Sequence, residues 1–185
     1  MSLSFFNPFR APTRAGAEWF SVGRASSFPD VGLSIDGKEN VSVDGARLCG
    51  NHGPNAAPGC KVFHVPKEDS SQRTEVDLPV DDAAQDLADQ VLVFQYRGKF
   101  HAIDHQCPHS SYPLSQGIPF DIEDFGIVLS AGLTCPKHNW SFDLFSGMSD
   151  RGNYKLRVWE VELRDIEGVQ TDDKEVWVRR KPRIG

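Results

Sequence analysis

The hydrophobic pattern of the chain consists mostly of short apolar runs that are separated by glycine-containing and polar turns. Residues 91–96 and 99–104 are rich in β-branched and aromatic side chains, and Arg97-Gly98 between them predicts a tight hairpin turn. Further short strands are predicted at residues 19–23, 33–35, 41–43, 155–163 and 175–180. Short strands at this spacing predict an antiparallel all-β fold.

Two stretches depart from the strand pattern. Asp81 or Asp82 is a suitable N-cap for a short helix over residues 81–89, which contains alanine and leucine. Residues 68–77 are polar and are interpreted as a surface excursion. No apolar run approaches the roughly 20 residues that span a bilayer, so we expect a soluble protein.

Composition and charge narrow the class of protein. A length of 185 residues with 39% hydrophobic residues suits one domain with a core of ordinary size. The formal net charge of −6 argues against a nucleic-acid-binding protein, because such proteins usually present a basic face. An acidic protein is instead expected to be attracted to a basic docking patch on a partner protein.

Two short segments carry the candidate chemistry, Cys107-Pro108-His109 and, 26 residues after His109, Cys135-Pro136-Lys137-His138. Each supplies one thiol and one imidazole, and together they offer four soft or borderline metal ligands. The proline after each cysteine prevents a regular helix, so the ligands are expected on two facing loops. Zinc accepts such a ligand set, and a zinc-stabilised binding module is one interpretation.

The pattern resembles the Rieske iron–sulfur family, in which a C-x-H segment is followed at a distance by C-P-x-H and then by an aromatic residue and a glycine. Leu114 and Gly117 after the first segment, and Phe142 and Ser146-Gly147 after the second, extend the match. The intervening residues 117–134 form a longer stretch than in bacterial Rieske ferredoxins. This stretch resembles the one found in small eukaryotic Rieske-domain proteins.

The resemblance implies a Rieske-type antiparallel β sandwich. The expected Rieske domain covers residues 18–180, and a small cluster-binding subdomain at about residues 104–148 carries the two ligand loops. Within the family pattern, Cys107 and Cys135 are expected to bind one iron of a single [2Fe–2S] cluster, and His109 and His138 the other iron. His101 and His105 fall outside the ligand spacing and are interpreted as structural residues.

The mixed ligand set affects the expected reduction potential. Two ferric ions, two sulfides, two thiolates and two neutral imidazoles give a formally neutral centre, which accepts an electron more easily than a four-thiolate cluster. The resemblance places the chain at the low end of the Rieske range, at roughly −150 mV. Trp140 and Phe142 stand where high-potential members carry hydroxyl-bearing side chains, and Tyr112 and Lys137 stand where those members carry a disulfide. The Lys137 cation is expected to favour the reduced state.

These features predict an electron-transfer protein that carries one electron between a reductase and an oxygenase or other redox enzyme. A catalytic mononuclear-iron site needs further histidines and a carboxylate in a large pocket, and the region of resemblance leaves no room for one, so we expect a carrier rather than an enzyme. A Rieske subunit, redox sensor or assembly component of an oxidoreductase complex is the alternative within the family. The zinc module is the alternative outside it.

A second stretch with cysteine and histidine has no metal-binding counterpart in the resemblance. Cys49-x2-His52 and Cys60-x3-His64 have a spacing that zinc accepts. The glycines and prolines of this stretch favour a flexible loop, so these four side chains are interpreted as ordinary loop and strand residues. A second zinc site and a disulfide are the two alternatives.

The two ends of the chain differ from the domain between them. Residues 1–17 contain no acidic side chain and are interpreted as an N-terminal arm, with a mitochondrial import signal as the alternative. Residues 181–185 are expected to form a solvated basic tail. Two of the four cysteines are assigned to the cluster, which favours a reducing compartment. We therefore expect a cytoplasmic protein, or a mitochondrial one if the arm is an import signal.

Overall fold

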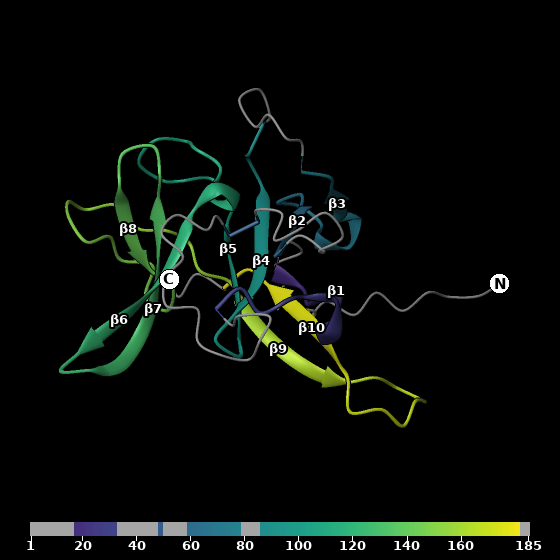
Figure 1. Cartoon of the computed structure of the whole chain (residues 1–185). Helices are drawn as coiled ribbons and strands as arrows, with labels where there is room; N and C mark the ends of the chain where they lie inside the picture. Colours follow the sequence, from purple (N-terminus) through teal and green to yellow (C-terminus); the bar gives the residue numbers. More distant parts are fainter. Residues whose placement is uncertain (1–16, 33–47, 50–58, 79–85, 182–185) are drawn as a thin grey trace, which may run out of the picture.

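The computed structural model of the chain describes residues 17–32, 48–49, 59–78 and 86–181 (Figure 1). Its strands are β1 (Phe20–Arg24), β2 (Cys60–His64), β3 (Thr74–Val76), β4 (Gln90–Tyr96), β5 (Lys99–Asp104), β6 (Ile118–Asp124), β7 (Ile127–Cys135), β8 (Trp140–Asp143), β9 (Glu160–Asp165) and β10 (Lys174–Arg179). The strands pair antiparallel in sheets of order β1-β10-β9, β3-β2-β4-β5 and β6-β7-β8. The predicted all-β fold is confirmed.

Helical structure in the described residues is limited to short 3-10 turns. These are η2 (Ala25–Ser27), η3 (Ser70–Gln72) and η4 (Leu114–Gln116). None of the described helices has the length and apolar character of a membrane span.

Strand β4 is covered on both of its faces. Val91 and Val93 pack into a core that is shared with β1 and β10. Leu92 and Phe94 point to the opposite face and pack into a second core, which is shared with β7 and β8. Alternate residues of a strand face opposite sides, so burial on both sides explains why this segment lacks polar alternation.

The β6-β7-β8 sheet forms a smaller part of the molecule, to the left of β5 in Figure 1. The chain enters it from β5 through the first candidate ligand loop and η4, and the second candidate loop joins β7 to β8. Residues 117–134, the long stretch noted in the sequence, form the β6–β7 hairpin with Phe125 and Gly126 at its turn. One core therefore lies within the sandwich, and the second core joins the sandwich to a small subdomain that carries both loops, as predicted.

Several element predictions need correction. Residues 68–77, which the sequence analysis interpreted as a surface excursion, contain η3 and the edge strand β3. A strand at the edge of a sheet can form with few apolar side chains, so its polar sequence did not reveal it. Strand β9 begins at Glu160, whereas the sequence predicted a strand from residue 155. Residues 86–89 of the predicted helix lie in a coil and turn, while its first part and the predicted strands at residues 33–35 and 41–43 lie outside the described residues.

Cys49 and Cys60 form a disulfide with a Cα–Cα distance of 5.1 Å. Their interpretation as ordinary residues is therefore wrong, and neither thiol is available for a second zinc site; His52 lies outside the described residues. The Leu48 and Cys49 N–H groups donate to the carbonyls of Gly117 and Ser115, so the disulfide ties β2 to the segment around η4. The cysteine count no longer supports a reducing compartment.

Candidate metal centre

The first candidate ligand loop, residues 107–112, is closed by its own backbone. The Cys107 N–H donates to the Tyr112 carbonyl at 2.9 Å, and the Ser111 N–H donates to the Cys107 carbonyl at 2.9 Å. A bridge between Gln106 and Pro113 continues the pairing at the base of the loop. These contacts leave the Cys107 side chain facing inward, with 1% of its surface exposed.

His105 anchors this loop to the rest of the protein. Its ring Nδ1 lies 2.7 Å from Gln90 Oε1, and its Nε2 lies 2.8 Å from Ser115 Oγ. The imidazole is buried, and burial lowers the pKa of His105 to about 4. Both ring nitrogens are occupied, as expected for the structural role that the sequence assigned to this histidine.

The second candidate loop is the turn of the β7–β8 hairpin. Cys135 pairs with Trp140 across the hairpin, and the Asn139 N–H donates to the Cys135 carbonyl at 2.9 Å. Asn139 has a φ of 56°, a left-handed conformation that asparagine tolerates better than most residues. Cys135 is completely buried, whereas His138 is exposed on the outside of the turn.

The two loops bring together one pair of thiols and one pair of imidazoles. The rings of His109 and His138 have centroids 5.1 Å apart and lie at 78° to each other. Cys107 and Cys135 are both free and buried, and each shifts the pKa of the other. Among the described residues, no three His, Cys, Asp or Glu side chains are grouped to hold one metal ion.

The thiol pair is electrostatically coupled. A hydrogen bond from Cys135, with help from Ser110, lowers the pKa of Cys107 to about 5. The neighbouring Cys107 and burial raise the pKa of Cys135. The contact between the two sulfurs therefore favours loss of one proton from the pair, and bound metal would favour loss of the second proton as well.

The free donor atoms fit a binuclear iron–sulfur cluster. His109 Nδ1 is buried and has no hydrogen-bond partner among the described residues. A buried ring nitrogen without a partner is unfavourable in an isolated protein, and metal coordination would satisfy it. Two buried thiols beside two imidazoles also supply the Cys and His ligand types of a Rieske centre.

Comparison with known proteins identifies the family. The Rieske [2Fe-2S] domain family matches residues 71–162. The ferredoxin component of the alkene monooxygenase system of Xanthobacter autotrophicus is 30% identical over 93 residues, which cover 46% of this chain and 70% of that protein. The chain belongs to the Rieske [2Fe–2S] domain family. Its cofactor is therefore a [2Fe–2S] cluster.

Two human proteins are also similar to this Rieske protein. Apoptosis-inducing factor 3 of Homo sapiens is 33% identical over 87 residues, which are 46% of this chain and 11% of that protein. The Rieske domain-containing protein of Homo sapiens is 38% identical over 58 residues, which are 31% of this chain and 34% of that protein. The chain thus spans only a small part of the length of these two relatives.

Aromatic residues surround His109 of the Rieske protein. The Trp140 ring stacks on His109 with a centroid distance of 4.5 Å, and Tyr154 meets His109 edge-on at 5.1 Å. Arg151 lies over the Trp140 ring, with its guanidinium 5.2 Å from the ring centroid. The segment after β8 therefore covers this side of the site, although the sequence analysis did not single out Tyr154.

Ser110 is a second residue that the sequence analysis missed. Its Oγ lies 3.8 Å from Cys135 Sγ, within reach of a weak hydrogen bond to sulfur. A thiolate ligand has no proton, so the hydroxyl would be the donor when metal is bound. Ser110 directly follows His109, and the position next to a predicted ligand was the available clue.

Tyr112 and Lys137 connect the two loops without a disulfide. Lys137 Nζ lies 5.8 Å from the centroid of the Tyr112 ring, which is the range of a cation–π contact. The high-potential members of the family are expected to have a covalent link at these positions. In this Rieske protein a weaker and solvent-exposed contact takes its place.

Proposed function

We propose that this Rieske protein transfers single electrons between a reductase and an oxygenase or another redox enzyme. The proposal rests on the buried Nδ1 of His109, which has no hydrogen-bond partner in the part of the chain that the structure describes, together with the two free buried thiols. We assign Cys107 and Cys135 to one iron, and His109 and His138 to the other. When bound, the cluster supplies one-electron chemistry.

The chain's own residues give the two histidines different surroundings. Trp140 and Tyr154 contact the His109 ring and cover part of it. His138 lies on an exposed turn with no comparable cover from the described residues. We therefore propose that a partner docks over the His138 side, where the distance between partner and cluster ligand is smallest.

Two observations support the choice of partner class. A relative that is 30% identical is named as a ferredoxin component of a monooxygenase system, and this chain covers 70% of it. The net charge of −6 is suited to a partner with a basic docking patch, because opposite charge speeds association. The proposed potential is at the low end of the Rieske range, at about −150 mV.

The test combines anaerobic spectroelectrochemistry with stopped-flow oxidation of the reduced protein by cytochrome c, a basic one-electron acceptor. We expect one reversible one-electron couple, and an oxidation rate that rises with acceptor concentration and falls with added salt. A protein with no reversible couple, or one that reduced the acceptor no faster than dithionite alone, would overturn the proposal.

A further inference from the structure

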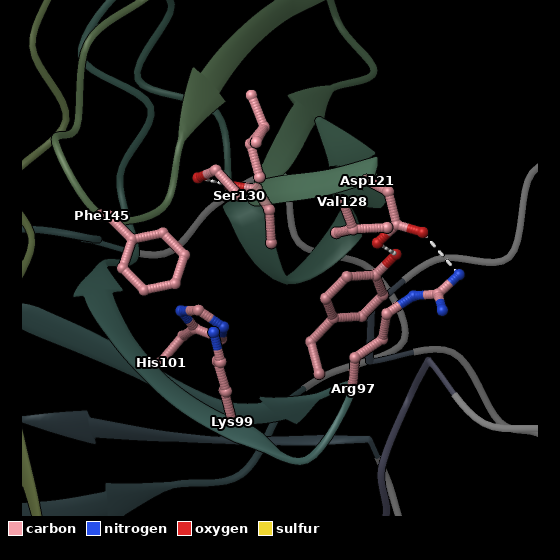
Figure 2. A pocket seen from close by; sticks show the side chains of 10 residues that line it. Arg97, Lys99, His101, Asp121, Val128, Ser130 and Phe145 are labelled. Atoms are coloured by element: carbon pink, nitrogen blue, oxygen red, sulfur yellow. Dashed lines mark hydrogen bonds and ion pairs between the residues drawn. The ribbon is translucent and has the colours of Figure 1, made fainter. Parts of the chain in front are cut away.

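A cavity lies between the β4–β5 hairpin and the β6–β7 hairpin, apart from the candidate metal centre. It has a volume of about 200 Å³ and is open on one side. Lys99 and His101 of β5 form one wall, and Val128 and Leu129 of β7 form the opposite wall. Figure 2 shows Phe145 facing His101 across this space, with the Lys99 side chain beside the imidazole.

His101 lines this cavity. The residue is 5% exposed, and its Nε2 is buried without a hydrogen-bond partner among the described residues. The imidazole stacks on Phe94 with centroids 5.4 Å apart, and it meets the Phe145 ring edge-on at 5.4 Å. A water molecule bound here would need two to four polar partners, and the rings beside Nε2 provide none.

Lys99 lines the same cavity and brings a positive charge close to His101. It makes no ion pair within the part of the chain that the structure describes, and its Nζ lies 5.3 Å from the Phe145 centroid. The other polar groups are already engaged. Arg97 and Tyr96 both bind Asp121, at 2.5 Å and 3.0 Å, and Ser130 donates to Asp143. Figure 2 shows the Asp121 contacts at the far end of the cavity from Phe145.

We propose that this cavity binds a small planar aromatic carboxylate, with its carboxylate between Lys99 and His101 Nε2 and its ring against Phe145. The volume is below that of a typical drug-sized site, so a single ring with one substituent is the appropriate size. Aromatic rings favour stacked or edge-on contact with other rings, and the carboxylate would receive a charge-assisted hydrogen bond. The exposed side chains of Val128 and Leu129 would cover the outer edge of the ring.

The burial of His101 supports a ligand that accepts a hydrogen bond from a neutral imidazole. Burial, followed by the nearby Lys99 charge, lowers the pKa of His101 to about 4, and Asp143 and Asp30 oppose this shift only in part. The imidazole is therefore neutral near pH 7 and can place its one proton on Nε2. It then donates to the ligand without adding a second buried charge to the site.

The test is calorimetric titration of the cluster-containing protein with benzoate, phenol and acetate at pH 7. We expect saturable binding of benzoate, with phenol and acetate at least about tenfold weaker because each lacks one half of the recognised structure. Lys99→Gln and His101→Phe should each weaken benzoate binding by about tenfold, and His101→Phe keeps a ring in the stack. Visible absorption of the cluster should stay unchanged in both variants, which shows that they fold.

Lys67→Gln is the matched control, since Lys67 is an exposed lysine that pairs with Asp89 away from the cavity. It should leave benzoate binding unchanged. The proposal is overturned if benzoate shows no saturable binding, if phenol binds as tightly as benzoate, or if both cavity variants bind benzoate as well as the control does. None of these results depends on the electron-transfer partner.

Discussion

The two ligand loops of this Rieske protein hold equivalent residues by different means. The first loop is attached to the interior: His105 at its base has both ring nitrogens hydrogen-bonded, and Trp140 and Tyr154 contact His109. The second loop is a short hairpin turn on which His138 is exposed. One loop is therefore held by a buried polar network, and the other by local turn geometry.

This difference suggests a division of roles between the loops. A rigid and covered His109 side would protect the cluster from water, while the exposed His138 side would provide contact with partners. The interior attachment should then contribute mainly to stability. Changes at the exposed turn should affect exchange of electrons more than folding.

The largest effect is expected from the buried thiols. Cys135→Ser should abolish the visible absorption of the cluster and leave iron well below two atoms per chain, because serine is a poor iron ligand. Cys60→Ser removes the Cys49–Cys60 disulfide, so it should keep the absorption and lower the free energy of unfolding by about 2–3 kcal/mol. Equal iron content in the two variants, measured after anaerobic purification, would contradict the assignment of ligands.

The next effect concerns the interior attachment of the first loop. His105→Leu leaves the side chains of Gln90 and Ser115 buried without their partner, so it should lower the free energy of unfolding by about 3 kcal/mol. Chemical denaturation measures this directly. A loss below about 0.5 kcal/mol would show that the network does not hold the loop.

A smaller effect on stability is expected at the second loop, which is held by its turn conformation and not by a buried hydrogen-bond network. Asn139→Ala places a Cβ-bearing residue without a compensating polar group at a φ of 56°, and should cost about 1 kcal/mol. Asn139→Gly is the matched control, and it should be neutral or slightly stabilising, since glycine adopts this conformation easily. If the Asn139→Ala and Asn139→Gly variants unfolded at the same temperature, backbone strain at this position would not contribute to the stability of the loop.

The Ser110 hydroxyl should tune the reduction potential. It lies 3.8 Å from Cys135 Sγ, and a donor to a ligand sulfur favours the reduced state with its extra negative charge. Ser110→Ala should therefore lower the potential by about 20–40 mV in spectroelectrochemical titration. Ser111→Ala, one residue further along the loop, serves as the control. A potential unchanged within error in Ser110→Ala would exclude this role.

The smallest shift is expected from the exposed cation beside the second loop. Lys137→Glu should lower the potential by about 10–20 mV, because solvent and salt screen an exposed charge. The shift should shrink further as ionic strength rises. A potential that rose in Lys137→Glu would contradict the expected sign.

The strand pattern was predictable from sequence where local chemistry dictates it. Arg97-Gly98 was recognised as a hairpin turn, and both residues adopt positive φ there. The edge strand β3 was missed because its side chains are largely exposed and polar. The Cys49–Cys60 disulfide was missed since pairing depends on how the loops pack, and that packing involves Ser115 and Gly117, far along the chain.

The site shows the same limit. The motif spacing predicted Cys107, His109, Cys135 and His138 as ligands, and the structure brings the thiols together and the imidazoles together. The contacts of Tyr154 with His109, and of Ser110 with Cys135, arise from tertiary folding and carry no short motif. The Nε2 of His101, which has no partner among the described residues, could not be found from sequence either, since its burial depends on the tertiary fold.

The ligand assignment is tested most directly by EPR and pulsed EPR of the dithionite-reduced protein. The account predicts a rhombic signal with an unusually low average g value and nitrogen couplings from two imidazoles, with one set lost or altered in His138→Cys. A signal without nitrogen coupling, or a colourless protein that contains one zinc and stays colourless after cluster reconstitution, would contradict it.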